Sequence, residues 1–107
     1  MIARTWTGAV RRADADDYAE DIRETGFAEY GQTARNRGAW LLRRDEREQT
    51  QFIARSLWES ADAIRAFVGD DIEAAVLYPV DERYLIGDHA VAHYEIVSEV
   101  TPDDRGP

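Results

Sequence analysis

The chain has 107 residues, a formal net charge of −9 and 44% hydrophobic residues, which predicts one globular domain with a buried core. It contains no cysteine, and all 13 of its basic residues are arginine. Disulfides, thiolate metal sites, cysteine nucleophiles and lysine Schiff bases are therefore excluded. The acidic balance repels phosphate backbones and anionic lipid surfaces, so neither nucleic acid nor a membrane is an expected partner.

The N-terminal part of the chain predicts a strand followed by a helix. Residues 2–10 are rich in β-forming residues and indicate the first strand. Asp14 can cap a helix whose apolar stripe includes Tyr18 and Ile22, with more acidic residues in its first turn. Gly31 is a typical helix stop, so we expect the helix to end near Tyr30.

The middle of the chain predicts a β-hairpin. Residues 38–44 and 51–58 indicate two strands, and the polar run 45–49 indicates the turn between them. In the second strand Phe52 and Trp58 point to one face, whereas Ile53 and Leu57 point to the other, so both faces carry apolar groups. A chain this short has helices for only one face. We therefore expect the other face to pack against a second copy.

The last third of the chain predicts two helical segments and a final strand. Ser60 can cap one helix and Asp71 a second over residues 72–78, which Pro79 would end. Residues 79–88 indicate a connecting loop, 91–100 the last strand, and 101–107 a flexible tail after a single domain of residues 1–100. The order β-α-β-β-α-β predicts an α+β, ferredoxin-like fold with an antiparallel sheet.

Targeting segments are not apparent in the sequence. The first residues contain no apolar run of signal-peptide length, and no stretch approaches the roughly 18 apolar residues of a membrane span. A cytoplasmic location is therefore the expectation.

Four segments resemble the antibiotic biosynthesis monooxygenase family of dimeric α/β barrel proteins. They are Ile2-Ala3-Arg4-Thr5-Trp6, Ser56-Leu57-Trp58-Glu59-Ser60, Ala63-Ile64-Arg65-Ala66-Phe67 and His93-Tyr94-Glu95-Ile96-Val97. The resemblance covers residues 1–100 and implies a homodimer whose sheets pack face to face, with a pocket in each subunit between sheet and helices. Some family members oxygenate polyketide anthrones or quinols without metal or flavin, and others degrade haem.

The haem-degrading branch of this family can be examined residue by residue. Its members pair an asparagine on the first strand with a tryptophan at the end of the third, and use a histidine on the second helical segment as the iron ligand. The resemblance places Trp6 at the asparagine, Trp58 at the tryptophan and Val76 at the histidine. Because valine cannot ligate iron, haem is not an expected cofactor, and no other cofactor is expected.

Aromatic residues are the candidates for the walls of the implied pocket. Trp6 and Trp58 could stack on a flat aromatic substrate, and the alternative is that both are core residues. The predicted substrate-binding set also contains Phe67, Val76, Tyr30 and Tyr78. A tyrosine at the pocket mouth could donate to a developing oxyanion, or could simply bridge core and water.

His93 and Arg4 are the candidate catalytic residues. A neutral imidazole can take a phenolic proton near neutral pH, and a guanidinium can hold an oxyanion. The alternatives are a structural histidine and an internal salt bridge. His89 is expected to be a solvated residue in a loop. Because the sequence offers no firm third ligand beside His89 and His93, we predict no metal site.

The sequence therefore predicts a cofactor-independent, monooxygenase-like protein that acts on an aromatic or polyketide-type small molecule. Two alternatives stay open. One is a non-catalytic dimeric module of the same fold that binds a small ligand or a partner, and the other is a non-oxidative cyclase or isomerase. The alternation of side chains along a strand tells which face each residue occupies but not how large a cavity lies beside it. The sequence therefore leaves open whether a pocket exists.

Overall fold

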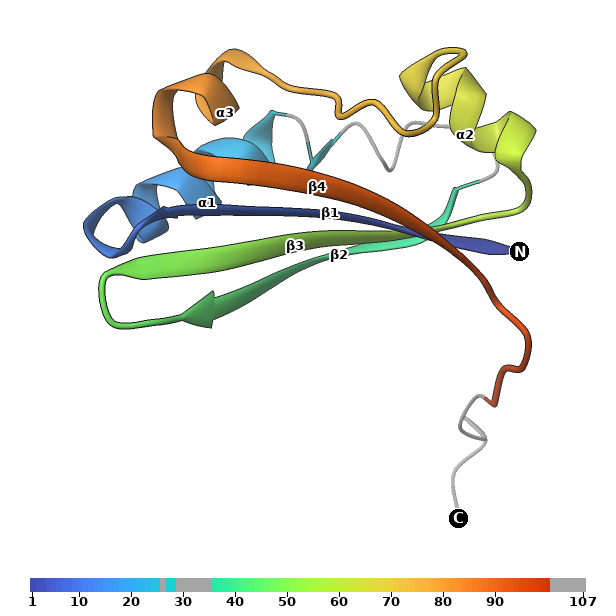
Figure 1. Ribbon diagram of the computed structural model, residues 1–107, viewed down its shortest axis with the longest axis horizontal. Helices are drawn as coiled ribbons and strands as arrows, with labels where there is room; N and C mark the ends of the chain where they lie inside the picture. The colour runs from blue at the N-terminus through green and yellow to red at the C-terminus, as the bar shows by residue number, and fades with distance from the viewer. Residues whose placement is uncertain (26, 29–35, 101–107) are drawn as a thin grey trace.

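The computed structural model describes residues 1–25, 27–28 and 36–100. Its elements are β1 (Ile2–Arg11), the 3-10 helix η1 (Arg12–Asp14), α1 (Ala15–Glu24), β2 (Asn36–Asp45), β3 (Gln49–Trp58), α2 (Ala61–Val68), α3 (Pro79–Tyr84) and β4 (Leu85–Glu95) (Figure 1). The four strands form one antiparallel sheet in the order β2-β3-β1-β4. The predicted α+β, ferredoxin-like fold is confirmed. The predicted tail, 101–107, lies outside the described residues, as does Tyr30.

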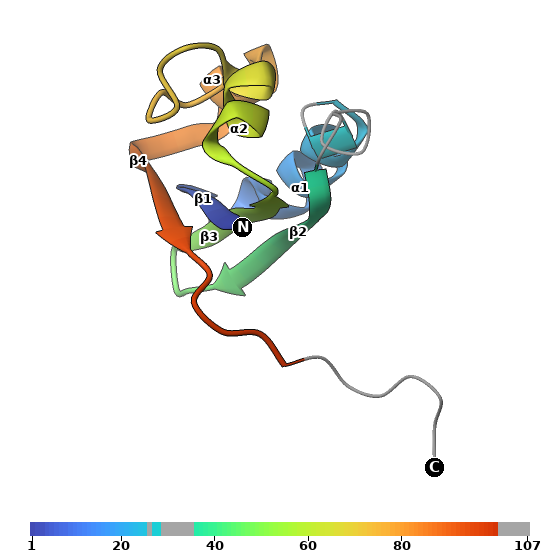
Figure 2. The ribbon, with the colours of Figure 1, turned by 90° about the vertical axis from the view of Figure 1, so that its right-hand side faces the viewer.

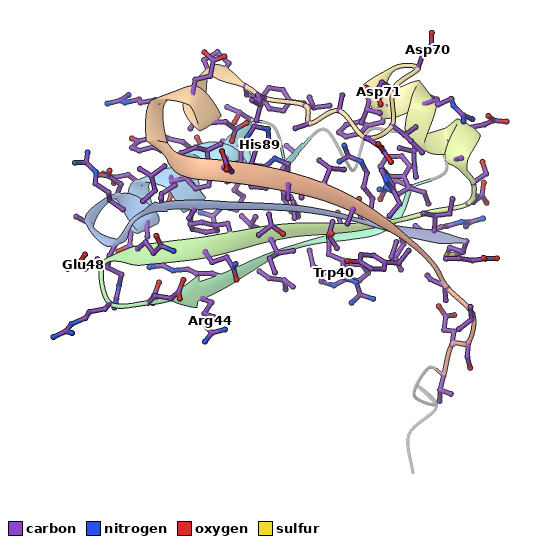
Figure 3. The ribbon with its side chains drawn as sticks, viewed as in Figure 1. Trp40, Arg44, Glu48, Asp70, Asp71 and His89 are labelled. Atoms are coloured by element: carbon purple, nitrogen blue, oxygen red, sulfur yellow. The ribbon has the colours of Figure 1, made fainter. Side chains whose placement is uncertain are left out.

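The helices lie on one side of the sheet, as Figure 2 shows. Side chains alternate along each strand, so Trp6 on β1 and Phe52 on β3 turn toward the helices and are buried. On the opposite face Trp40 and Leu42 of β2 stay 45% and 44% exposed. Figure 3 shows Trp40 pointing away from the helices. The predicted alternation of β3 is confirmed, and the sheet has one covered and one open face.

The core under the helices consists of two clusters. The larger one joins β1 and β3 to α1, and the smaller one centres on Trp58 and the first turns of α2. The members of the first are Trp6, Val10, Ala15, Tyr18, Ile22, Phe52 and Ala54, and those of the second are Trp58, Ala63 and Ile64. In the described part of the chain, no helix is long and apolar enough to cross a membrane.

Of the three predicted helix caps, Ser60 and Asp14 have different outcomes. Ser60 caps α2, because its Oγ accepts a hydrogen bond at 3.2 Å from the N–H of the third residue of that helix. Asp14 does not cap α1 with its side chain; its Oδ2 accepts instead from Arg11 Nε at 3.3 Å. The helix also ends at Glu24, before the predicted end near Tyr30.

The prediction that Pro79 ends a helix over residues 72–78 is wrong, because Pro79 begins α3. Proline is well suited to the first position of a helix, where its missing N–H would have no partner anyway. Tyr78 before it is extended, and Asp81 Oδ2 accepts the Tyr78 N–H at 2.8 Å. Asp71, the predicted cap, holds a turn instead, with its Oδ1 accepting the Glu73 N–H at 3.1 Å.

The last strand begins earlier than predicted and ends earlier. β4 runs from Leu85 to Glu95, so the predicted loop over residues 79–88 is instead α3 followed by the first part of β4. The pairing register of β4 with β1 shifts between Thr7 and Ala9, and Gly87 lies in this bulge with a φ of 68°. A positive φ suits glycine, and a bulge interrupts the alternation that makes a strand recognisable in sequence.

Candidate functional site

A small cavity lies between the covered face of the sheet and the helices. Its volume is about 40 Å³, which is room for a few water molecules. The charged groups in its wall are one arginine and one aspartate, and most of the rest is apolar or aromatic. The lining side chains are Arg4, Trp6, Tyr18, Ile22, Phe27, Leu41, Ala54, Phe67, Val76, Tyr78 and Asp81.

Arg4 is a buried cation in the sheet side of this wall. It stands on β1 with its side chain on the covered face, and it is only 2% exposed. Its Nη2 donates to the carbonyl oxygen of Ala74 at 2.9 Å, in the segment between α2 and α3. Burial of a guanidinium is costly unless its N–H groups find acceptors. A guanidinium carries only donors and a positive charge, so it favours an anionic oxygen among the groups that could lie against it.

Tyr18 and Asp81 form a hydrogen-bonded pair on the helical side of the cavity. The Tyr18 hydroxyl donates to Asp81 Oδ1 at 2.7 Å, and the Tyr78 N–H donates to Oδ2 at 2.8 Å. Tyr18 is 1% exposed and Asp81 3% exposed. Among the described residues no cation lies within ion-pair distance of this carboxylate, and the Tyr18 hydroxyl and the Tyr78 N–H are hydrogen-bond donors to its two oxygens.

Trp6 provides an aromatic wall beside Arg4. The two residues are two positions apart on β1, so their side chains reach the same cavity. Trp6 is buried, and its Nε1 has no hydrogen-bond acceptor within the described residues. Its ring lies over Gly8, where a Cβ would stand 2.7 Å from Trp6 Cη2. His89 stacks on it with ring centroids 6.5 Å apart, and Figure 3 shows this histidine on β4 rather than in the predicted loop.

His93 lies next to Arg4 but does not line the cavity. The two residues are partners in the pairing of β1 with β4. Burial lowers the pKa of His93 below its ordinary value of 6.5, and the charge of Arg4 lowers it further, whereas Glu73 opposes the shift. The imidazole is therefore neutral at neutral pH. Its Nε2 is buried and has no hydrogen-bond partner in the part of the chain that the structure describes.

Trp58 stands behind the cavity rather than in its wall. It is fully buried in the smaller core cluster, and its Nε1 donates to Ser56 Oγ at 2.8 Å. Its ring lies 5.4 Å, centroid to centroid, from the ring of Phe67, which does line the cavity. Trp58 therefore supports one aromatic wall from the side of the core.

The structure brings together five of the eight predicted site residues in one cavity wall. These five are Arg4, Trp6, Phe67, Val76 and Tyr78. His93 and Trp58 adjoin this wall without lining it, and the placement of Tyr30 is outside the described residues. Whether any of the eight takes part in binding or catalysis stays a prediction.

Sequence reasoning missed the helical half of the site. Tyr18 was expected only as part of the apolar stripe of α1, and Asp81 was placed in a loop. A signal for Asp81 was present, because a proline followed two positions later by an acidic residue is typical of the first turn of a helix. The other lining residues that were not predicted are Ile22, Phe27, Leu41 and Ala54.

Solved structures resemble this chain over nearly its whole length. One of them, a protein from Bacillus cereus classed as an antibiotic biosynthesis monooxygenase, gives a TM-score of 0.68 at 16% identity and covers 94% of this chain and 97% of that chain. This chain has the antibiotic biosynthesis monooxygenase fold. The resemblance carried by the four sequence segments is therefore confirmed at the level of the fold.

Two other proteins with the antibiotic biosynthesis monooxygenase fold hold ligands. A haem degrader from Mycobacterium tuberculosis, with two haems in its active site, gives a TM-score of 0.66 at 18% identity and covers 94% of this chain and all of that chain. A monooxygenase from Streptomyces coelicolor in complex with nanaomycin D gives a TM-score of 0.62 at 15% identity, and the match covers 95% of this chain and 92% of that chain. No family model and no curated protein matches the sequence. At these identities the likeness shows the fold alone.

Proposed function

We propose that the protein is a cofactor-independent, monooxygenase-like enzyme that acts on an aromatic or polyketide-type small molecule in this cavity. One observation carries the proposal: a nearly fully buried arginine, Arg4, faces a cavity whose other walls include Trp6 and Phe67. Apolar walls with a few fixed polar groups are typical of small-ligand sites. The Streptomyces coelicolor structure supports the choice of substrate class, because a protein of this fold holds nanaomycin D.

The chemistry assigned to Arg4 follows from what oxygenation without a cofactor requires. The substrate must first lose a proton, because a carbanion or phenolate can give an electron to O₂ far more readily than the neutral molecule can. An anthrone then becomes a quinone: its CH₂ carbon gains one oxygen atom, and the second oxygen atom leaves as water. The nearly fully buried guanidinium of Arg4 stabilises the oxyanion. The predicted role of His93 as a base stays untested.

Haem degradation does not fit these residues. The resemblance places Val76 where the haem-degrading proteins carry their iron ligand, and Val76 lines the cavity. None of the residues in the described cavity wall is a histidine, cysteine or methionine. The chain therefore differs from the haem degraders at the position that holds iron.

A non-catalytic ligand-binding module is the second candidate, and the size of the cavity favours it. Ligand sites usually have a volume of about 300–1,000 Å³, whereas this cavity has about 40 Å³. A flat aromatic molecule enters only if side chains or the segment between α2 and α3 move. The cytoplasmic location expected from the sequence stays a prediction as well.

The proposal also includes a homodimer formed through the open face of the sheet. Apolar side chains of β2 and β3 lie there without helical cover, and Trp40 and Leu42 are the most exposed of them. A two-fold axis would bring the same residues of two copies together. An exposed apolar patch of this kind is typical of an association surface.

Oxygen consumption tests the proposed reaction. Purified protein is incubated with a panel of anthrones and quinols, and O₂ uptake is followed together with the mass of the products. We expect uptake of O₂ with at least one member of the panel and its loss in Arg4→Met. Failure of every member would contradict the proposal. Conversion without O₂ uptake would indicate a cyclase or isomerase, and binding without conversion would indicate the non-catalytic module.

A further inference from the structure

The Tyr18 hydroxyl has a fixed direction of hydrogen bonding. A phenol oxygen can donate one hydrogen bond and can also accept. Its only proton is directed to Asp81 Oδ1 at 2.7 Å, and Tyr78 holds the other carboxylate oxygen in place. Any further hydrogen bond at the Tyr18 oxygen must therefore be one that it accepts. A ligand group that lies against it must bring a proton, as a hydroxyl does.

The sheet side of the cavity has the opposite character. Arg4 carries only donors, and the indole of Trp6 carries one donor and no acceptor. Trp6 is 7% exposed, lines the cavity, and finds no acceptor for its Nε1 among the described residues. A ligand group that lies against these residues must bring an acceptor oxygen, and beside a guanidinium an anionic oxygen is favoured.

From these two walls we infer that Tyr18 and Asp81 act together as the proton acceptor of the cavity for a hydroxyl-bearing, phenol- or enol-type ligand. The ligand O–H gives its proton to the Tyr18 oxygen while the Tyr18 hydroxyl gives its own proton to Asp81 Oδ1. The products are a ligand oxyanion, a neutral tyrosine and a neutral aspartic acid, so one negative charge moves from Asp81 to the ligand. Arg4 in the same cavity stabilises that charge.

This inference rests on the proposed function only in taking the cavity as the ligand site. It gives the base role to a pair that lines the cavity, in place of His93, which does not. Asp81 also has a structural role, because it completes the capping box of α3. A loss of stability on mutation would therefore not distinguish the two roles, and the test must follow the ligand proton itself.

The experiment uses 4-nitrophenol as the probe, because its phenolate is yellow and its neutral form is not. The probe is added to the full-length protein without O₂, at a pH low enough that the free probe is mostly neutral. Wild type should bind it as the phenolate. In Tyr18→Phe and in Asp81→Asn the probe should still bind, with the ionised fraction lowered at least about tenfold. Binding is measured separately by equilibrium dialysis.

Tyr84→Phe serves as the control. It removes a phenol hydroxyl from the same aromatic cluster, since the Tyr84 and Tyr18 ring centroids are 5.9 Å apart, but Tyr84 does not line the cavity. We expect this variant to bind and ionise the probe as wild type does. His93→Ala is a separate test of the competing base predicted from the sequence, and ionisation of the probe should persist in it.

Each outcome supports or overturns the inference. Ionisation that persists in Tyr18→Phe, that is lost in His93→Ala, or that is absent in wild type would overturn it. If Tyr18→Phe does not fold, NMR of the wild-type hydroxyl protons replaces it: the hydrogen-bonded Tyr18 proton should shift when the probe binds, and an unchanged signal would overturn the inference. Ionisation of the probe combined with no O₂ uptake from any anthrone or quinol would remove the proposed oxygenation and leave the proton acceptor in place.

Discussion

Replacement of Trp40 by serine should convert the proposed homodimer to monomers. Trp40 lies on the open face of the sheet, 45% exposed, with the Arg55 guanidinium 5.6 Å from its ring centroid. A fully exposed tryptophan presents about 250 Å², so about 110 Å² of each Trp40 is available for burial in a two-fold interface. At about 25 cal/mol per Å², two copies contribute about 5 kcal/mol to association. Loss of most of this should raise the dimer Kd by roughly three orders of magnitude.

Sedimentation over a range of protein concentrations measures this change. Leu77→Ser is the matched control, because Leu77 is 39% exposed but lies in the segment between α2 and α3, away from the open face. We expect wild type and Leu77→Ser to be dimers at concentrations where Trp40→Ser is a monomer with unchanged circular dichroism. A Trp40→Ser dimer as tight as wild type, or a wild type that is already monomeric at micromolar concentration, would refute the assignment of this face.

Three further predictions test the fold around the site. Gly8→Ala should lower the free energy of unfolding by about 1–2 kcal/mol in denaturant melts, because its Cβ would stand 2.7 Å from Trp6 Cη2; an unchanged midpoint would contradict this packing. Ser60→Ala should lower it by about 1 kcal/mol through loss of the α2 cap, whereas Asp14→Ala should show no comparable capping loss. Because the folded state lowers the pKa of His93, protonation favours the unfolded state, and stability should fall as pH drops through 6.5. His93→Gln should weaken that fall. If denaturant melts of wild type and His93→Gln show the same dependence of stability on pH, His93 is not the cause of the fall.

A strand of the covered face was predictable where its side chains alternate without interruption. β3 shows this pattern along its full length, and Phe52 and Trp58, which were predicted to share one face, are both buried. Along β1 the same period places Arg4 and Trp6 in one cavity wall, although Ala3 beside Arg4 is buried as well. The start of β4 escaped prediction, because the bulge at Gly87 breaks the alternation there.

The helical half of the site was not predictable to the same degree. Proline before an acidic residue can end one helix or begin another, and the choice depends on whether Tyr78 is extended, which packing decides. With Pro79 taken as a stop, Asp81 fell into a loop, and its hydrogen bond with Tyr18, 63 positions away in the chain, could not be foreseen. Contacts at such separation depend on the tertiary fold and leave no local pattern.

The position of β1 in the sheet has a consequence for how the protein is made. β1 is synthesised before the other strands of the sheet, yet it lies between β3 and β4, and β4 ends only at Glu95. A growing chain can pair β1 with β3 early, but the other edge of β1 stays open until β4 has emerged. Pairing between such distant segments is slow, and an open strand edge is a template for association with other chains. Chains that stop before β4 should therefore aggregate rather than fold.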